Sequence, residues 1–165
     1  MIILLDGSKG AGKTSTSELL LQKLENTVYL GLDAQRRTLP VEDKTRIELN
    51  KEAFDIIVTK TKESVAEGKD VLIDCILTPE RISLFEDISK VMNVPLYKFF
   101  LRATRTTLLN RVLARDIASN RETSIERFDQ MYTMAYAKEL DGFTIIETDD
   151  IGLEEIVSTV LQKIG

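Results

Sequence analysis

Short, continuous apolar runs alternate along the chain with longer stretches in which apolar residues recur every three or four positions. The runs predict buried strands at residues 1–5, 27–32, 71–74, 95–101 and 143–147. The periodic stretches predict helices at about residues 15–24, 42–67, 79–92, 104–116, 124–138 and 153–164. This alternation predicts an α/β fold, in which helices cover both faces of a five-stranded parallel sheet.

Turn and cap residues set the expected boundaries around the second and third strands. Residues 33–40 are mostly polar and end in Pro40, so we expect a loop there. The next helix is expected to start near Glu42 and to bury one stripe: Ile47, Phe54, Ile57, Val58, Thr61 and Val65. Thr78 and Pro79 are typical of an N-cap and a first helical position, and they predict the start of the following helix.

The connection between the first strand and the first helix has the pattern of a phosphate-binding loop. It reads G-S-K-G-A-G-K-T over residues 7–14 and fits G-x-x-x-x-G-K-[ST] at every position. Glycines let such a loop wrap around a phosphate, whose charge is attracted by the loop amides and by the helix N-terminus. Lys13 is predicted to reach the β- and γ-phosphates of a nucleotide, and the Thr14 hydroxyl to ligate Mg²⁺.

We expect the nucleotide to bind nine consecutive residues: Gly7, Ser8, Lys9, Gly10, Ala11, Gly12, Lys13, Thr14 and Ser15. Lys9 is the second lysine of this loop, and we expect it to lie in solvent rather than to act in catalysis. The alternative is a glycine-rich turn that binds nothing. The strand before the loop and the helix after it favour the binding loop instead.

Composition narrows the class of protein. The chain has 165 residues, 43% of them hydrophobic and 30% charged, which predicts one globular domain over residues 1–165 with a substantial core. No apolar run approaches membrane-spanning length, and the first strand begins at Met1, so we expect no signal peptide and no membrane partner. The single cysteine, Cys75, fits a reducing compartment, and we expect a cytoplasmic protein with Cys75 packed in the core. Because the chain has no histidine, any general base must be a carboxylate or a lysine.

Charge is unevenly distributed along the chain. The net charge of −5 disfavours broad binding to duplex nucleic acid. Six of the ten arginines nevertheless fall in one segment: Arg102, Arg105, Arg111, Arg115, Arg121 and Arg127. Arg111 and Arg115 are four residues apart and share a helical face, so we predict a lid at about residues 104–127 that brings these two arginines over transferring phosphates. The alternative is a solvated face whose arginines pair with nearby carboxylates, and we expect this for the other four.

Two aspartates mark the ends of predicted strands. Asp33 follows the second strand and Asp74 closes the third, so both should lie beside the phosphate-binding loop at the carboxyl edge of the sheet. One carboxylate could accept a proton from an attacking hydroxyl, and the other could hold Mg²⁺ directly or through water. Each could alternatively be a turn or cap residue. Arg36 lies one helical turn beyond Asp33 and is predicted to bind an acidic group of the substrate, with Arg37 as the alternative.

In this order and spacing, the motifs resemble those of the small P-loop kinases, which have a three-layer P-loop NTPase fold. Within that group, the chain is similar to the 5′-kinase domain of phage polynucleotide kinase and its bacterial relatives, including zeta-toxin-like and chloramphenicol-phosphotransferase-like kinases. The resemblance rests on the phosphate-binding loop and on D-A-Q-R (33–36), V-L-I-D-C-I-L-T-P-E-R (71–81), V-P-L-Y-K-F-F-L-R (94–102), L-L-N-R-V-L-A-R (108–115) and S-I-E-R-F-D-Q-M-Y (124–132).

The resemblance implies a role for each matching residue. Asp33 would be the base that activates the acceptor hydroxyl, and Arg36 would contact a phosphate on the acceptor side. Lys13 and Thr14 would serve ATP and Mg²⁺, and Arg115 would be the lid arginine. The chain departs from the polynucleotide kinases after Asp74, where apolar residues replace polar ones, and this weakens the case for nucleic-acid contacts.

We therefore expect a Mg²⁺-dependent kinase that moves the γ-phosphoryl group of ATP to a hydroxyl. The acceptor is a polynucleotide 5′ end, a nucleoside or another small molecule. One alternative is a nucleoside-monophosphate kinase, whose phosphate acceptor needs no base. Another is a non-catalytic nucleotide switch, although the chain lacks N-K-x-D and has no D-x-x-G after the third strand.

Overall fold

The computed structural model describes residues 1–165 and contains five strands and seven helices. The strands are β1 (Ile2–Asp6), β2 (Thr27–Gly31), β3 (Asp70–Asp74), β4 (Leu96–Arg102) and β5 (Thr144–Glu147). The helices are α1 (Lys13–Leu21), α2 (Leu32–Arg37), α3 (Arg46–Ala66), α4 (Pro79–Met92), α5 (Arg105–Ala118), α6 (Ile125–Tyr136) and α7 (Leu153–Ile164). None of the helices is both long and apolar enough to cross a membrane.

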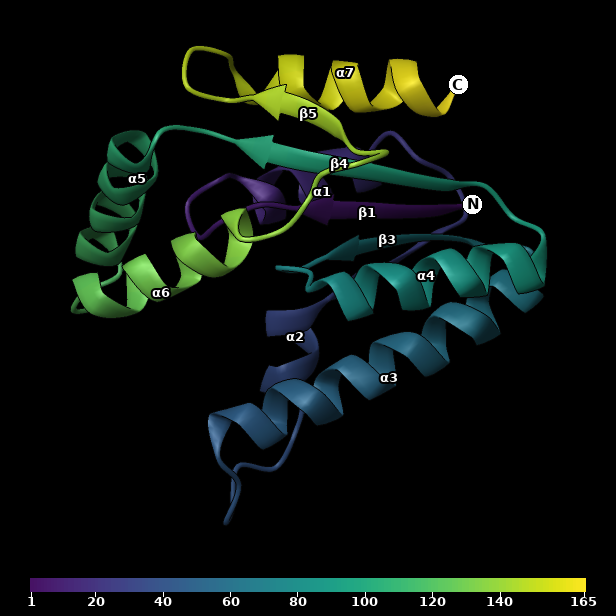
Figure 1. Ribbon diagram of the computed structural model, residues 1–165, viewed down its shortest axis with the longest axis horizontal. Helices are drawn as coiled ribbons and strands as arrows, with labels where there is room; N and C mark the ends of the chain where they lie inside the picture. Colours follow the sequence, from purple (N-terminus) through teal and green to yellow (C-terminus); the bar gives the residue numbers. More distant parts are fainter.

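The strands form one parallel sheet in the order β2-β3-β1-β4-β5. Helices cover both of its faces, with α3 and α4 on one side and α1 and α7 on the other (Figure 1). The α/β fold predicted from the sequence is therefore confirmed. Because β3 lies between β1 and β2, the carboxyl ends of these three strands are neighbours at one edge of the sheet.

Strand β1 lies at the centre of the core, and all of its residues are buried. Ile2 and Leu4 face the layer that includes Phe54 and Phe85, whereas Ile3 and Leu5 face the layer that includes α7. Successive strand residues point to opposite faces, so both faces of this strand must be apolar. Burial of each such side chain stabilises the fold by about 1.5–3 kcal/mol, which fixes the strand that leads into the phosphate-binding loop.

Two predictions about the segment after β2 were wrong. Residues 33–40 do not form a simple loop, because helix α2 covers Leu32–Arg37. Helix α3 begins at Arg46 rather than near Glu42, because Thr45 and Glu48 cap it reciprocally: each side chain accepts a hydrogen bond from the backbone amide of the other. Ile47 lies in the first turn of α3 and is 81% exposed. That turn extends beyond the sheet (Figure 1), so the helical stripe there has no core to face.

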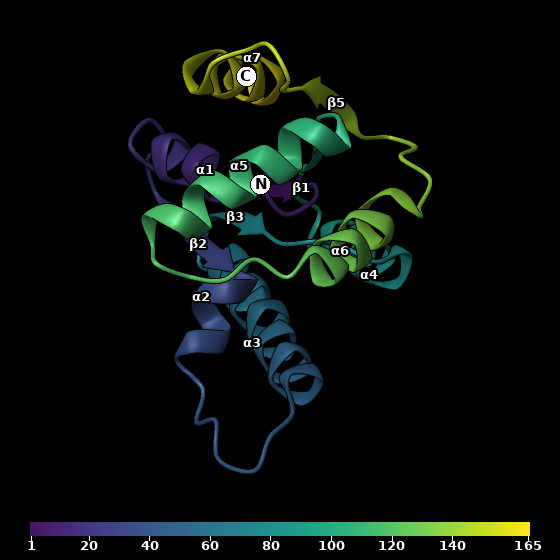
Figure 2. The same ribbon diagram turned by 90° about the vertical axis from the view of Figure 1, so that its left-hand side faces the viewer.

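Helices α5 and α6 both lie beyond the carboxyl edge of the sheet (Figure 2). Phe128 and Tyr132 are stacked, as are Tyr132 and Tyr136, whose ring centroids are 4.5 Å apart. The Tyr136 hydroxyl donates a hydrogen bond to the Ala103 carbonyl at 2.9 Å. The end of α6 is thus anchored next to the end of β4.

Candidate functional site

The loop between β1 and α1 is packed tightly against two other elements. Gly7 and Gly10 have φ angles of 143° and 89°. A Cβ at Gly7 would lie 2.6 Å from the Leu101 carbonyl oxygen in β4, and one at Gly10 would lie 2.6 Å from that of Leu108 in α5. Both the backbone angles and the close approach require glycine at these positions. The loop therefore has a fixed shape against β4 and α5.

Helix α1 begins at Lys13, with Gly12 as its N-cap. The ammonium group of Lys13 donates to the carbonyl oxygens of Gly7 at 2.9 Å and of Ser8 at 3.2 Å. The lysine therefore folds back across the loop, so that its charge and the N-terminus of α1 act on the same small region. This is the arrangement that attracts the phosphates of a nucleotide.

The carboxylate of Asp74 meets the hydroxyl of Thr14 at the end of β3. Thr14 Oγ1 donates to Asp74 Oδ2 at 2.8 Å, and the Tyr29 hydroxyl donates to the same oxygen at 3.2 Å. Burial, followed by the negative charge of Asp74, raises the pKa of Tyr29, so the phenol remains a donor. The two residues predicted to hold Mg²⁺ are thus in contact, and Asp74 is only 6% exposed.

Thr14 and Asp74 fit a magnesium ion by their chemistry. Hydroxyl and carboxylate oxygens are the hard donors that Mg²⁺ takes, and the ion commonly uses one or two protein ligands together with nucleotide phosphates and water. The structure contains no cluster of three or more acidic, cysteine or histidine side chains arranged to hold a metal. At this position Thr14 and Asp74 would hold the ion together with the phosphates of a bound nucleotide.

Asp33 lies on the other side of β3 from the loop and is held by Arg36. It falls in the first turn of α2, two residues beyond Gly31, the residue of β2 that pairs with Asp74. Arg36 Nη2 lies 2.6 Å from Asp33 Oδ1, and Arg36 Nη1 donates to Asn50 Oδ1 in α3 at 2.8 Å. The side chain of Asp33 is 70% exposed, whereas that of Arg36 is 15% exposed. Asp33 is thus a fixed but solvent-facing carboxylate.

A buried ion pair that was not predicted from the sequence lies beside the loop. Asp6, the last residue of β1, lies 2.5 Å from the ammonium of Lys138, and both side chains are almost fully buried. Asp6 also accepts from the amide of Gly7 at 2.6 Å, while Lys138 donates to the Leu77 carbonyl at 2.7 Å. Burial raises the pKa of Asp6, and the positive charge of Lys138 opposes that shift. This pair joins the start of the loop to the residues just after α6.

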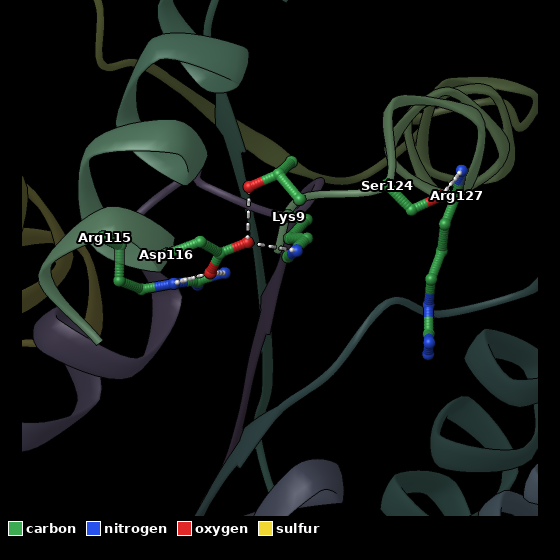
Figure 3. A network of polar contacts seen from close by, with 6 residues as sticks. Lys9, Arg115, Asp116, Ser124 and Arg127 are labelled. Carbon is green, nitrogen blue, oxygen red and sulfur yellow. Dashed lines mark hydrogen bonds and ion pairs between the residues drawn. The ribbon is translucent and has the colours of Figure 1, made fainter. Parts of the chain in front are cut away.

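A second network joins the loop to α5 (Figure 3). Asp116 is buried and accepts hydrogen bonds from Lys9 at 3.3 Å and from the Thr123 hydroxyl at 2.9 Å. Arg115 donates to its other oxygen at 3.0 Å. Burial alone would raise the pKa of Asp116, but the hydrogen bonds from Arg115, Thr123 and Lys9 outweigh it and lower the pKa to about 2. The expectation for Lys9 was wrong, because its ammonium is paired with a carboxylate rather than free in solvent.

The two arginines that the sequence places in a predicted lid, Arg111 and Arg115, have different partners. Arg111 donates to the hydroxyl of Thr148 at 3.1 Å and also to its carbonyl, so it is fixed at the end of β5. The side chain of Arg115 is 48% exposed and is held only by Asp116, on the side of the phosphate-binding loop. The sequence predicted that both arginines reach a phosphate. Of the two, Arg115 is the one whose side chain remains free enough to do so.

Comparison with known proteins identifies the class. A family model described as an AAA domain matches residues 2–137, well over half of the chain, so the chain belongs to that family. No curated protein matches it in sequence.

Solved structures extend the comparison. A protein of Chloroflexus aurantiacus J-10-fl is similar with a TM-score of 0.77 and 15% identity, over 98% of this chain and 96% of its own. A sugar kinase from Janibacter sp. HTCC2649 matches with a TM-score of 0.69 and 14% identity, over 99% of this chain and 93% of its own. A chain of the Pnkp1/Rnl/Hen1 RNA repair complex matches with a TM-score of 0.65 and 13% identity, over 82% of this chain and 44% of its own. The protein thus has the phosphotransferase fold of the small P-loop kinases, as its motifs predicted.

Proposed function

We propose that this protein is an ATP- and Mg²⁺-dependent kinase that transfers the γ-phosphoryl group of ATP to a hydroxyl. The arrangement that carries the proposal is the separation of its two strand-end carboxylates. Asp74 is buried and in contact with Thr14, the residue that follows the loop lysine. Asp33 is exposed and lies on the far side of β3, with Arg36 beside it. One carboxylate therefore serves the metal and nucleotide, and the other remains available to the acceptor.

The acceptor-side group, which we define as Asp33, Arg36 and Asn50, would prepare the hydroxyl for attack. The hydroxyl proton passes to the carboxylate of Asp33 as the acceptor oxygen forms its bond to the γ-phosphorus. The bond from phosphorus to the β–γ bridging oxygen breaks at the same time, and ADP leaves with that electron pair. Arg36 holds Asp33 in position through the 2.6 Å ion pair.

The loop residues and Arg115 would hold the nucleotide and neutralise its charge. The nine residues Gly7 to Ser15 wrap the phosphates, and Lys13 reaches the β- and γ-phosphates. A Mg²⁺ ion bound at Thr14 and Asp74 would lower the negative charge that the attacking oxygen must approach. Arg115, and more remotely Arg111, would act from a lid that covers about residues 104–127 of a single domain, 1–165. Positioning and charge neutralisation supply most of the rate in such reactions.

Two solved structures suggest the range of acceptors. One is a sugar kinase and another belongs to an RNA repair complex. Both names are compatible with a hydroxyl acceptor, and the motifs favour a polynucleotide 5′ end or a nucleoside. We propose action in the cytoplasm, where ATP and Mg²⁺ are available and a free thiol such as that of Cys75 remains reduced.

A panel of acceptors tests the proposal. Transfer of labelled γ-phosphate from Mg-ATP would be followed to a 5′-hydroxyl oligonucleotide, nucleosides, nucleoside monophosphates and neutral sugars, with Lys13→Ala as the inactive control. Label on a hydroxyl compound that disappears with Lys13→Ala supports the proposal. Label on nucleoside monophosphates alone supports the alternative of a phosphate acceptor. Tight nucleotide binding with no transfer to any compound supports a nucleotide switch and contradicts the kinase.

A further inference from the structure

The side chain of Tyr29 in β2 reaches the carboxyl end of the neighbouring strand β3. In the sheet Tyr29 pairs with Leu72, yet its hydroxyl donates to Oδ2 of Asp74, two residues further along β3, at 3.2 Å. Residues two apart on a strand point to the same face, so the tyrosine ring extends along that face toward the site. The ring also packs against the core layer that contains Leu20 of α1. Tyr29 is therefore held between the sheet and the helix that follows the phosphate-binding loop.

Gly31 provides the space that the tyrosine occupies. This glycine is the residue of β2 that pairs with Asp74. Its φ of −84° and ψ of 132° are extended angles that any residue adopts, so the backbone does not require glycine here. A Cβ at this position would, however, lie 2.3 Å from the Tyr29 hydroxyl oxygen and 2.7 Å from the ring carbon that carries it. The absence of a side chain at Gly31 thus permits the contact between Tyr29 and Asp74.

The two carboxylate oxygens of Asp74 have different surroundings. Oδ2 accepts hydrogen bonds from the hydroxyls of Thr14 at 2.8 Å and Tyr29 at 3.2 Å, whereas Oδ1 accepts none within the protein. Two donors on one oxygen fix the orientation of the carboxylate and leave the other oxygen for a metal ion or its bound water.

The two donors differ in what else they must do. Thr14 is itself a proposed ligand of Mg²⁺, so its hydroxyl would serve two partners when the ion is bound. Tyr29 is not a proposed ligand, and its hydroxyl donates only to Asp74. Because its ring is packed against the core, the tyrosine can hold the carboxylate in the same orientation with or without the ion. Such outer hydrogen bonds to a metal ligand change metal affinity by about 10- to 100-fold.

We propose that Tyr29 is a positioning residue for the Mg²⁺ site: its hydroxyl orients Asp74 so that Oδ1 is presented to the ion, and Gly31 leaves the space in which it does so. The inference rests on the proposed function, because it takes Thr14 and Asp74 as the residues that hold the metal. Tyr29 should therefore affect the binding of nucleotide together with Mg²⁺, and not the binding of nucleotide alone.

Nucleotide binding with and without the ion tests this role without any need for turnover. Isothermal titration calorimetry of the full chain gives the dissociation constant of a non-hydrolysable ATP analogue in saturating Mg²⁺ and in excess chelator. The ratio of the two constants is the magnesium coupling, the factor by which the ion strengthens nucleotide binding. Tyr29→Phe is expected to lower the magnesium coupling by about tenfold and to leave binding in chelator unchanged. A purely structural role would instead weaken binding equally in both conditions, and that result would overturn the inference.

Two further variants assign the effect to the hydroxyl. Gly31→Ala displaces the hydroxyl without changing the tyrosine, so it should lower the magnesium coupling as Tyr29→Phe does, and the double change should lower it no further. Tyr97 packs against the same core layer from the start of β4, and its hydroxyl forms no hydrogen bond within the protein. Tyr97→Phe should therefore leave the coupling unchanged. An unchanged coupling in Tyr29→Phe would overturn the inference, as would a coupling near one in the unchanged protein.

The failure of the inference can be told apart from the failure of the proposed function. Loss of magnesium coupling in Tyr29→Phe, with no γ-phosphoryl transfer to any acceptor, would keep the positioning role and contradict the kinase. Transfer that disappears with Lys13→Ala, together with an unchanged coupling in Tyr29→Phe, would keep the kinase and overturn the role of Tyr29.

Discussion

The hydroxyl of Thr14 lies 2.8 Å from the carboxylate of Asp74, which brings the start of α1 into contact with the end of β3. The two residues are 60 positions apart in the chain. Their contact places two hard oxygen donors next to a loop suited to phosphates. This relationship defines the side of the site that we assign to the nucleotide and Mg²⁺.

We predict that Thr14→Val and Asp74→Asn each weaken the response to Mg²⁺. Each change removes one oxygen donor from the ion, so the Mg²⁺ concentration for half-maximal activity should rise by about 10- to 100-fold. Thr14→Ser keeps the hydroxyl and should respond as the unchanged protein does. A magnesium titration of the transfer rate measures all three, and an unchanged midpoint in Asp74→Asn would remove Asp74 from the metal site.

Loss of the buried partner of Asp6 is predicted to destabilise the protein strongly. Lys138→Met leaves an uncompensated buried carboxylate at the start of the loop and should lower the free energy of unfolding by about 3–5 kcal/mol. The double change with Asp6→Asn should recover part of that loss, because the charge left alone is then removed. Urea unfolding measures both. As a control, Lys23→Met breaks an exposed pair with Glu154 and should lower the free energy of unfolding by about 0–1 kcal/mol. An equally small effect of Lys138→Met would contradict its role as the partner of the buried Asp6 carboxylate.

The network around Asp116 predicts a dependence of stability on pH. The folded-state pKa of Asp116 is about 2, below its ordinary value of 3.8. A carboxylate whose pKa is lowered by folding stabilises the folded protein at pH values above its ordinary pKa. This stabilisation is lost as the pH falls toward the folded-state pKa. The contribution should therefore disappear between about pH 4 and pH 2, where Asp116 becomes protonated and releases Lys9.

Asp116→Asn should remove this part of the pH dependence, since no carboxylate remains to titrate. The free energy of unfolding of both proteins, measured by urea at several pH values in this range, gives the comparison. Asp129→Asn changes an exposed carboxylate of the neighbouring helix and serves as the control. Identical slopes for the unchanged protein and Asp116→Asn would show that Asp116 does not titrate in this range.

The fold could be predicted from the sequence because its evidence is local. The central strands β1 and β3 are continuous apolar runs, and burial on both faces of the sheet is the reason that they are continuous. The phosphate-binding loop could be predicted too, since its residues are adjacent in the chain. Helix α2 was missed because six residues are too few to show a helical period.

Contacts between distant residues were the part of the site that the sequence did not reveal. Lys9 and Asp116 are 107 positions apart, and nothing near either residue indicates the other. Asp6 does end a strand beside the loop, which could have indicated a polar role, but its partner Lys138 could be found only from the packing of α6.

The most direct test of the proposed hydroxyl kinase is the rate of phosphoryl transfer in Asp33→Asn. A general base of this kind contributes about 10²- to 10⁴-fold to the rate. We therefore predict a loss of that size in kcat, with unchanged ATP affinity, while Asp55→Asn on the exposed surface of α3 leaves kcat unchanged. Full activity in Asp33→Asn would contradict the account, because it would show that the acceptor needs no base and is a phosphate rather than a hydroxyl.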